Sequence, residues 1–274
     1  MKTLIKNTIK ALLKLRKPDS HKGNYGHALL IAGDMGRMGA AVIAARACLR
    51  SGVGLLTVSV PKEERFILQT AIPEAMLVMR ETIDAALNNY SAVAIGCGIG
   101  TSNDAKELIR FILSEINKPL LLDADALNII SEDKNLLNEM PEKTIITPHP
   151  KEFDRLFGVH NDDNDRAFTA IKKAQEYDII IVLKGHKTLI TSEGEAFFNT
   201  TGNAGLAKGG SGDALTGIIT AFLAQGYAAF DAAKMGVFIH GLAADLTLDN
   251  QSMESMLITD VIENLGKAFI NLRK

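Results

Sequence analysis

The segment GNAGLAKGGSGDALTGIITAFLAQG, residues 202–226, joins a glycine-rich loop to a long helical pattern. Five of its first eleven residues are glycines, and Asp213 stands at the junction. Glycine loses the most conformational entropy on folding, so a cluster of glycines before a helix indicates a backbone that approaches something closely. The first turn of a helix offers unpaired N–H groups and a partial positive charge, which suit a phosphate. The segment therefore predicts a phosphate cradle, with a flexible loop as the alternative.

The composition of the chain bounds its fold and its partners. It has 274 residues, of which 47% are hydrophobic and 23% are charged. This length is sufficient for one large α/β domain or two smaller domains. The formal net charge of −2 gives no electrostatic argument for a nucleic-acid partner. Cys48 and Cys97 fit neither a metal site nor a secreted disulfide pattern, so we expect free thiols.

The N-terminal stretch, at about 2–17, predicts an amphipathic helix stopped by Pro18. Its lysines recur every four residues, whereas its leucines and isoleucines fall largely on the other side. It lacks the continuous apolar core of a signal peptide, and no stretch of the chain is long enough to cross a bilayer. We expect a helix packed on its own domain or on a partner subunit, in a cytoplasmic protein without a membrane partner. A transit peptide or a membrane-surface helix is the alternative.

Short apolar runs alternate with helical patterns along the rest of the chain, which is typical of an α/β protein. The apolar runs predict strands at 27–33, 55–60, 91–96, 118–125, 143–148 and 178–185. Their nearly continuous apolar character indicates a central, mostly parallel sheet covered by helices on both faces. The remaining patterns predict helices at 38–51, 103–116 and 163–177, a hairpin at 187–200, and helices after residue 211. Since the chain shows no repeat or long linker, residues 1–274 predict a single domain.

Polar and glycine-rich segments follow five of the predicted strands, beginning with GDMGRMGA at 33–40. Ligands collect beyond the carboxyl ends of parallel strands, so these segments predict one shared cleft. A P-loop is excluded, because no segment places Lys and Ser or Thr directly after its last glycine. A dinucleotide-binding Rossmann motif is disfavoured, because GCGIG at 96–100 has the wrong glycine spacing.

The segment GSGD, residues 210–213, resembles the anion hole of the ribokinase-like superfamily. A wider set of motifs, spread over most of residues 20–217, resembles the stand-alone bacterial NAD(P)H-hydrate dehydratases. These motifs are SHKGNYGHALLIAG (20–33), GIG (98–100), LLDADALN (121–128), TPHPKEF (147–153), LKGHKT (183–188) and NTTGNAGLAKGGSGDALTG (199–217). The resemblance implies a single ribokinase-like domain.

The resemblance also implies a repair reaction. The S-forms of NADH hydrate and NADPH hydrate would be dehydrated to NADH and NADPH, while ADP is converted to AMP and phosphate, or ATP to ADP. Hydroxide is a poor leaving group, whereas a phosphorylated hydroxyl leaves easily. The family further implies Mg²⁺, a homo-oligomer that is a tetramer, and a functional partnership with a separate NAD(P)H-hydrate epimerase.

The resemblance implies a role for each matched residue. Asp213 would be the catalytic base, beside an anion hole made by Gly210, Ser211 and Gly212; its alternative role is a helix cap. At a helix N-terminus its carboxylate is expected to favour the ionised form. The hydrate would contact Ala40, Gly100, His149 and Asp213. The nucleotide would contact Lys184, Gly185, His186, Lys187, Thr188 and Gly212, and Mg²⁺ or its waters would contact Asp123, Asp125 and Glu152.

Two positions depart from the family pattern. The loop at 33–40 lacks the usual serine and aromatic residue, so the substrate-side wall near residues 34–38 is expected to differ. Lys208 stands where relatives often have threonine, and either contacts a phosphate or faces solvent.

Two other functions remain open. The first is a kinase of the same superfamily that phosphorylates a hydroxymethyl-pyrimidine or a hydroxyethyl-thiazole. The second is a nucleotide-binding sensor without turnover. The presence of Asp213 weighs against a sensor, because a sensor needs no base.

Overall fold

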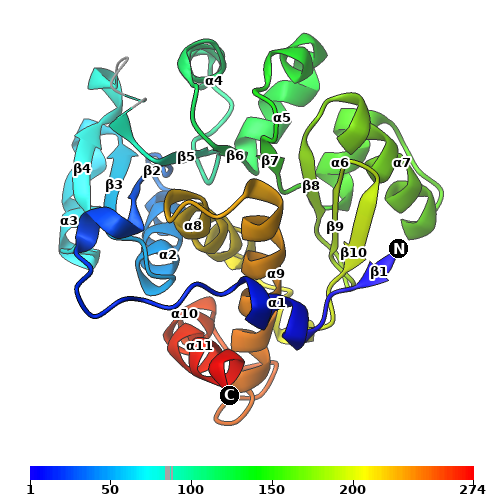
Figure 1. Cartoon of the computed structure of the whole chain (residues 1–274). Helices are drawn as coiled ribbons and strands as arrows, with labels where there is room; N and C mark the ends of the chain where they lie inside the picture. The colour runs from blue at the N-terminus through cyan, green and yellow to red at the C-terminus, as the bar shows by residue number, and fades with distance from the viewer. Residues whose placement is uncertain (84–86, 88) are drawn as a thin grey trace.

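One sheet with helices on both faces organises the chain, as the computed structural model shows for residues 1–83, 87 and 89–274 (Figure 1). Within these residues the sheet has ten strands. From one edge to the other they are β1 (Lys2–Thr3), β10 (Glu195–Phe198), β9 (Leu189–Ser192), β8 (Ile180–Leu183), β7 (Ile145–Ile146), β6 (Leu120–Leu122), β5 (Ala92–Ile95), β2 (His27–Ile31), β3 (Leu55–Val60) and β4 (Met76–Met79). The strands from β8 to β4 are parallel, and β9 and β10 form an antiparallel hairpin beside β8. The predicted mostly parallel sheet is confirmed.

The helices form two layers, one on each face of this sheet. On one face lie α1 (Lys6–Leu12), α2 (Met38–Arg50), α3 (Arg65–Ala71), α8 (Ser211–Ala224), α9 (Ala229–Thr247), α10 (Ile258–Glu263) and α11 (Leu265–Arg273). On the other lie α4 (Asn103–Glu115), α5 (Asp125–Glu132), α6 (Pro150–Phe157) and α7 (Asp163–Glu176). Short 3-10 turns complete the described elements at η1 (Lys22–Tyr25), η2 (Lys62–Glu64), η3 (Arg80–Thr82), η5 (Lys134–Glu139) and η6 (Ala204–Leu206).

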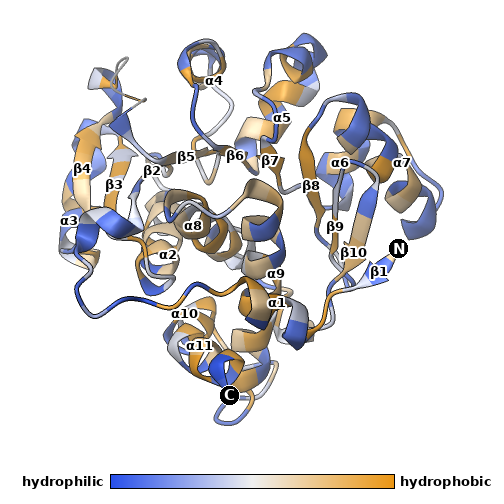
Figure 2. Ribbon diagram, viewed as in Figure 1, coloured by the Kyte–Doolittle hydropathy of each residue, from blue (hydrophilic) through white to orange (hydrophobic). Residues whose placement is uncertain are grey.

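Successive residues of the central strands are buried in opposite cores. In β2, Ala28 and Leu30 contact the core that contains α2 and α8, whereas Leu29 and Ile31 contact the core that contains α4 and α5. Side chains alternate along a strand, so a strand covered on both faces must be apolar at every position. Figure 2 shows this pattern, with hydrophobic strands inside and hydrophilic outer turns on helices such as α7.

The predicted strands are all present, although most are shorter than the apolar runs that predicted them. The strands β1 and β4 were not predicted. Both lie at an edge of the sheet and are too short to show a pattern of their own. Among the described residues, no helix is long and apolar enough to span a membrane.

The N-terminal helix α1 is shorter than the expected range of about 2–17, because the chain is already extended at Leu13, before Pro18. Leu4 and Ile9 are fully buried in the core that also contains the C-terminal helices. The Nζ of Lys6 donates a hydrogen bond to the side chain of Asn271, 3.0 Å away. The buried apolar side chains of this segment therefore pack on their own chain, whereas Ile5 is 49% exposed.

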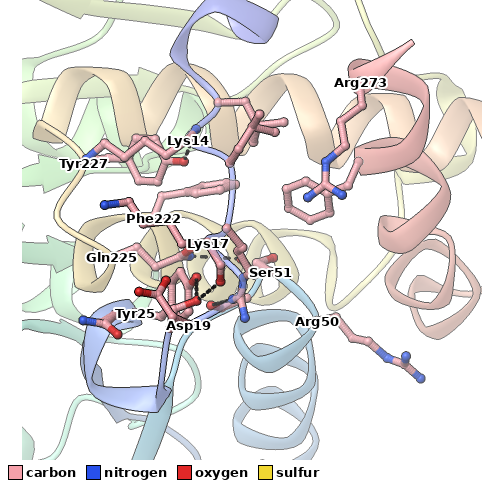
Figure 3. Close-up of a pocket in the computed structure, with 17 residues that line it drawn as sticks. Lys14, Lys17, Asp19, Tyr25, Arg50, Ser51, Phe222, Gln225, Tyr227 and Arg273 are labelled. Atoms are coloured by element: carbon pink, nitrogen blue, oxygen red, sulfur yellow. Dashed lines mark hydrogen bonds between the residues drawn. The ribbon is translucent and has the colours of Figure 1, made fainter.

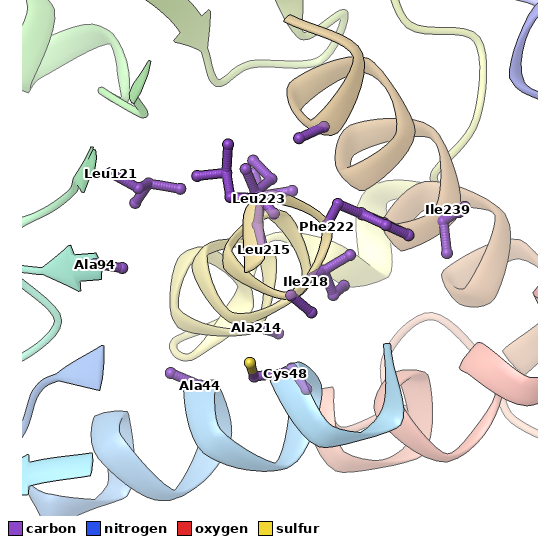
Figure 4. Close-up of a cluster of buried hydrophobic side chains, with 14 of the residues drawn as sticks. Ala44, Cys48, Ala94, Leu121, Ala214, Leu215, Ile218, Phe222, Leu223 and Ile239 are labelled. Atoms are coloured by element: carbon purple, nitrogen blue, oxygen red, sulfur yellow. The ribbon is translucent and has the colours of Figure 1, made fainter. Parts of the chain in front are cut away.

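Helix α8 lies between the sheet, α2 and α9, and every residue from Ala214 to Ala224 is buried. Figure 4 shows Ala44 and Cys48 of α2 facing Ala214 and Ile218 of α8. The two backbones approach so closely at Gly217 that a Cβ there would overlap the carbonyl oxygen of Ala44. A helix that is apolar all round belongs in a core, so the position of α8 is fixed by packing on all sides.

Gly217→Val should lower the free energy of unfolding by roughly 3 kcal/mol, because the overlap is with backbone atoms that cannot rotate away. Urea denaturation of the variant and the original protein measures the change, provided that the two proteins have the same m-value. The matched control is Gly266→Ala in α11, where an added Cβ meets no atom within 4 Å. We expect the control to be as stable as the original protein or slightly more stable. Equal stability of Gly217→Val and the original protein would contradict the packing described here.

Candidate active site

A cleft of about 760 Å³ lies beyond the carboxyl ends of β6, β7 and β8. Asp123, His149 and Lys184 come from the segments that follow these three neighbouring strands. The opposite walls are the 199–207 loop, the start of α8 and the middle of α9. Most of the predicted site residues line it: Asp123, His149, Glu152, Lys184, Gly185, His186, Thr188, Gly210, Ser211, Gly212 and Asp213. The predicted cleft is therefore present only in part: segments after three of the five strands line it, whereas Lys187, Ala40, Gly100 and Asp125 do not.

The N-terminus of α8 opens into this cleft. Gly210 precedes the helix in the left-handed conformation, with φ of 91°, which favours glycine. Among the described residues, the backbone N–H groups of Gly212 and Asp213 have no hydrogen-bond partner. A Cβ at Gly212 would lie 3.3 Å from the Nζ of Lys184, so a side chain there would crowd the cation. Free N–H groups, a helix dipole and a lysine together form an anion site.

Lys184 is held by buried acidic groups. Its Nζ is 2.8 Å from Oδ1 of Asp123 and 3.9 Å from Oε2 of Glu152. The other carboxylate oxygen of Asp123 accepts a hydrogen bond of 2.9 Å from Thr216 of α8. Burial lowers the pKa of Lys184, but Asp123 and Glu152 outweigh it and hold that pKa above its ordinary value. The lysine is therefore charged at neutral pH.

Burial raises the pKa of the Asp213 carboxyl above its ordinary value. A hydrogen bond from Cys97 lowers this pKa, Asp123 raises it, and the Lys184 cation lowers it. The expectation that the helix N-terminus favours the ionised form is therefore wrong in direction, because desolvation outweighs the helix dipole and the cation. A raised pKa makes Asp213 a stronger base than an exposed aspartate.

His149 is the N-cap of α6, and its side chain points back to the helix. Its Nδ1 accepts hydrogen bonds from the N–H groups of Lys151 and Glu152, at 3.1 and 3.2 Å. In return, the Glu152 carboxylate accepts the N–H of His149 at 2.8 Å. Burial lowers the pKa of His149, so the neutral ring carries its proton on Nε2. The sequence HPKE, residues 149–152, forms a capping box with proline at the first helical position.

Ala40 and Gly100 lie at a second place, between the carboxyl ends of β2 and β5. Here the strand order reverses direction, which is where α/β sheets open a crevice. A Cβ at Gly98 would lie 3.0 Å from the Cβ of Ala40. The N–H of Gly100 donates a hydrogen bond of 2.8 Å to Oδ2 of Asp125, and Nη1 of Arg37 lies 3.7 Å from the same oxygen.

Asp213 lines the cleft, and the pKa of its carboxyl responds to Cys97, Asp123, Lys184 and Asp125. Of these, Asp125 also accepts the N–H of Gly100. Asp213 therefore lies within electrostatic reach of both groups of predicted residues, whereas the cleft itself holds only one of them.

The predicted metal-contacting residues Asp123, Asp125 and Glu152 each have protein partners already. Within residues 1–83, 87 and 89–274, no three His, Cys, Asp or Glu side chains gather closely enough to hold a metal ion. A metal bound by protein carboxylates alone does not fit this arrangement. Contact through water remains a prediction.

Lys208 neither reaches the anion site nor extends into solvent. Its Nζ donates hydrogen bonds of 2.6 Å to the backbone oxygens of Glu254 and Met256. It therefore fastens the glycine-rich loop to the segment before α10.

Thr216 was missed as a site residue, although its position three residues after Asp213 places it on the same face of the helix.

A second cavity, of about 670 Å³, lies where the N-terminal segment crosses the end of α8 (Figure 3). Its walls are built by polar links across the chain: the N–H of Lys14 donates to the hydroxyl of Tyr227 at 2.9 Å, and Gln225 donates to the backbone oxygen of Ser51 at 3.1 Å. It contains none of the predicted site residues. The cleft at the start of α8 is therefore the candidate active site.

Lys184→Met should lower the free energy of unfolding by roughly 3 kcal/mol, because it leaves the buried carboxylate of Asp123 without its cation. Adding Asp123→Asn to this variant removes the unpaired charge and should recover part of the loss. Thermal unfolding of the original protein, Lys184→Met, Asp123→Asn and the double variant forms a cycle that measures the coupling energy between the two side chains. Additive losses would show that the two side chains do not interact.

Sequence and structure comparisons place the chain among known proteins. The family model described as NAD(P)H-hydrate dehydratase matches residues 28–267. The ADP-dependent (S)-NAD(P)H-hydrate dehydratase of Neisseria meningitidis is 39% identical over 92% of this chain and 87% of its own length. The bifunctional NAD(P)H-hydrate repair enzyme of Coxiella burnetii is 40% identical over 93% of this chain, which spans 52% of that enzyme.

A solved structure agrees with these relatives. The ADP/ATP-dependent NAD(P)H-hydrate dehydratase of Bacillus subtilis, co-crystallized with ATP and Mg²⁺, superposes with a TM-score of 0.88 at 32% identity. The match covers 99% of this chain and 98% of that one. The chain belongs to the NAD(P)H-hydrate dehydratase family, as its motifs indicated, and has the ribokinase-like fold.

Proposed function

We propose that the protein restores NADH and NADPH from their S-form hydrates, with ADP or ATP as phosphoryl donor. The observation that carries this proposal is the position of Asp213, a half-buried residue that lines the cleft beside the free N–H groups at the start of α8. One group at this point can meet a phosphoryl donor on one side and a hydroxyl substrate on the other. Residues 1–274 would carry out this reaction as a single domain.

The cleft would hold the nucleotide. Its volume of about 760 Å³ lies within the range of small-molecule sites, about 300–1,000 Å³. We assign nucleotide contacts to Gly212 and to the segment after β8, which comprises Lys184, Gly185, His186, Lys187 and Thr188. The charged Lys184 and the free amides of α8 would balance the negative charge of the phosphates.

The crevice between β2 and β5 would hold the hydrated nicotinamide, with contacts to Ala40, Gly100, His149 and Asp213. The positive φ of Gly98 brings its backbone close to Ala40 at the start of α2, and Gly100, also with positive φ, lies against the side chains of Arg37 and Asp34. His149 lines the cleft, and its neutral ring carries a proton on Nε2, which lies 3.4 Å from Oε1 of Glu152. Arg37, in the loop that departs from the family pattern, lies beside Gly100 and adds a positive charge at the mouth of the crevice.

The reaction follows from these positions. Asp213 accepts the proton of the substrate hydroxyl while the hydroxyl oxygen attacks the terminal phosphorus of the donor. The bond from this phosphorus to the bridging oxygen of the donor breaks, and the shortened nucleotide leaves. The free amides of Gly212 and Asp213, at the anion hole that also comprises Gly210 and Ser211, stabilise the charge on the transferring group. The phosphorylated oxygen then leaves as phosphate, and loss of a proton from the neighbouring carbon restores the ring double bond.

Mg²⁺ would neutralise phosphate charge when the nucleotide is bound. Since Asp123, Asp125 and Glu152 are already paired within the protein, they would contact the ion through water, and the phosphates would supply most direct ligands.

We further propose that the protein is a homotetramer in the cytoplasm and that it works with a separate NAD(P)H-hydrate epimerase. Light scattering that reports a monomer at all concentrations would contradict the tetramer.

The direct test supplies hydrated NADH with ADP or ATP and Mg²⁺, and records nicotinamide absorbance and phosphate release together. We expect both to rise in equal amounts, because each phosphate lost restores one ring. Donor consumption without a rise in absorbance would indicate a small-molecule kinase. Absence of both signals would indicate a sensor without turnover.

Asp213→Asn should lower turnover by ~10²–10⁴-fold, because asparagine cannot accept the proton. Asparagine caps helices as well as aspartate, and the substitution removes a buried carboxyl whose ionised form is disfavoured. The melting temperature should therefore be unchanged or higher, and AMP affinity should be unchanged. In the original protein, kcat/KM should fall as the pH decreases through the raised pKa of Asp213, above the ordinary value of 3.8.

The matched control for this variant is Asp163→Asn. Asp163 also lies in the first turn of a helix, α7, but its side chain is 91% exposed and outside the cleft. The Asp163→Asn variant should keep the turnover of the original protein. Turnover of Asp213→Asn close to that of the original protein would show that Asp213 is only a helix cap.

A further inference from the structure

His240 of α9 is a buried side chain that lines the cleft, and one of its ring nitrogens makes no hydrogen bond to the described residues. It is 6% exposed and lines the cleft with Val237 and Gly241. Among the described residues its Nε2 has no hydrogen-bond partner. The other buried unpartnered side-chain atoms belong to Ser51, Ser59 and Arg80, which do not line this cleft. An orphaned polar atom in a core costs free energy unless a ligand satisfies it, so its position requires an explanation.

The imidazole of His240 is uncharged in the folded protein. Burial lowers its pKa to about 4, so the ring is neutral at physiological pH. A neutral ring has one donor and one acceptor nitrogen, and gives no charge attraction for a phosphate. It suits a ligand group that is itself polar and uncharged.

The surroundings of His240 differ from those of Lys184. Four residues connect α8 to α9, and Gly236 of α9 packs directly on Ile219 of α8. His240, one turn further along α9, and Leu215, one turn earlier in α8, both line the cleft. Gly241 packs on the backbone of Thr201, which brings the 199–207 loop to the same wall. The apolar side chains lining this part of the cleft are Ala204, Leu206, Leu215 and Val237.

A planar heteroaromatic ring matches this part of the cleft. The apolar side chains can cover its faces, and its edge carries uncharged nitrogen donors and acceptors that a neutral imidazole can pair with. The phosphates of the same molecule would occupy the other part, at Lys184 and the start of α8. We propose that His240 recognises the nucleobase of the phosphoryl donor through a hydrogen bond from its imidazole to the edge of the base. This inference rests on the proposed function, which supplies a nucleotide to the cleft.

The test separates base recognition from phosphate binding. Calorimetry measures the Kd of ADP and of inorganic pyrophosphate, each with Mg²⁺, for the original protein, His240→Leu and His240→Gln. We expect His240→Leu to weaken ADP binding about 5–10-fold, the value of one hydrogen bond, and to leave pyrophosphate binding unchanged. His240→Gln keeps a donor and an acceptor, so it should recover part of the ADP affinity. The melting temperature of His240→Leu should not fall, because the substitution removes an unsatisfied buried atom.

His27→Leu is the matched control. His27 is half-buried and, like His240, has a lowered pKa, but its Nε2 is 2.8 Å from the hydroxyl of Thr57 and it lies outside the cleft. The His27→Leu variant should lose stability and keep its affinity for ADP. Unchanged ADP affinity in His240→Leu, or equal weakening of ADP and pyrophosphate, would overturn the assignment. Neither result would affect dehydration by the original protein, so failure of this inference is distinct from failure of the proposed function.

Discussion

The burial of α8 between the sheet, α2 and α9 is the constraint on which the site depends. Gly217 allows the backbones of α8 and α2 to approach so closely that the helix cannot shift without disrupting the core that the two helices share. Its N-terminus is therefore fixed at the carboxyl edge of the sheet, beside the segments that follow β6, β7 and β8. The phosphate cradle that the glycines predicted is a consequence of this packing, because free amides are useful only where they are held still.

The same burial sets the electrostatics. Removing Asp213 from water raises its pKa, whereas Asp123 is paired with Lys184 and Thr216 at 2.8 and 2.9 Å. Two carboxyl groups of one site thus receive different tasks. Asp123 fixes the cation, whereas Asp213 has no cation within ion-pairing distance in the described part of the chain and can take a proton. Pairs of titratable groups with contrasting surroundings are typical of acid–base sites.

The sequence predicted the parallel sheet and most of the cleft, because buried strands and strand-end glycines leave local patterns. It missed β1 and β4, which are short edge strands. It also gave the wrong direction for the pKa of Asp213, since desolvation depends on residues distant in the chain. His240 lies in an apolar helix of nineteen residues and becomes distinctive only when its orphaned nitrogen is seen beside the cleft.

The central claim is that the N-terminus of α8 binds the transferable phosphate with Asp213 beside it. A crystal structure of the protein with ADP and Mg²⁺ tests this most directly. We expect the terminal phosphate to accept hydrogen bonds from the amides of Gly212 and Asp213, with Lys184 on its other side and the Asp213 carboxyl facing the crevice. A nucleotide bound in the cavity between the N-terminal segment and α8, or with its phosphates turned away from Gly212, would contradict the account.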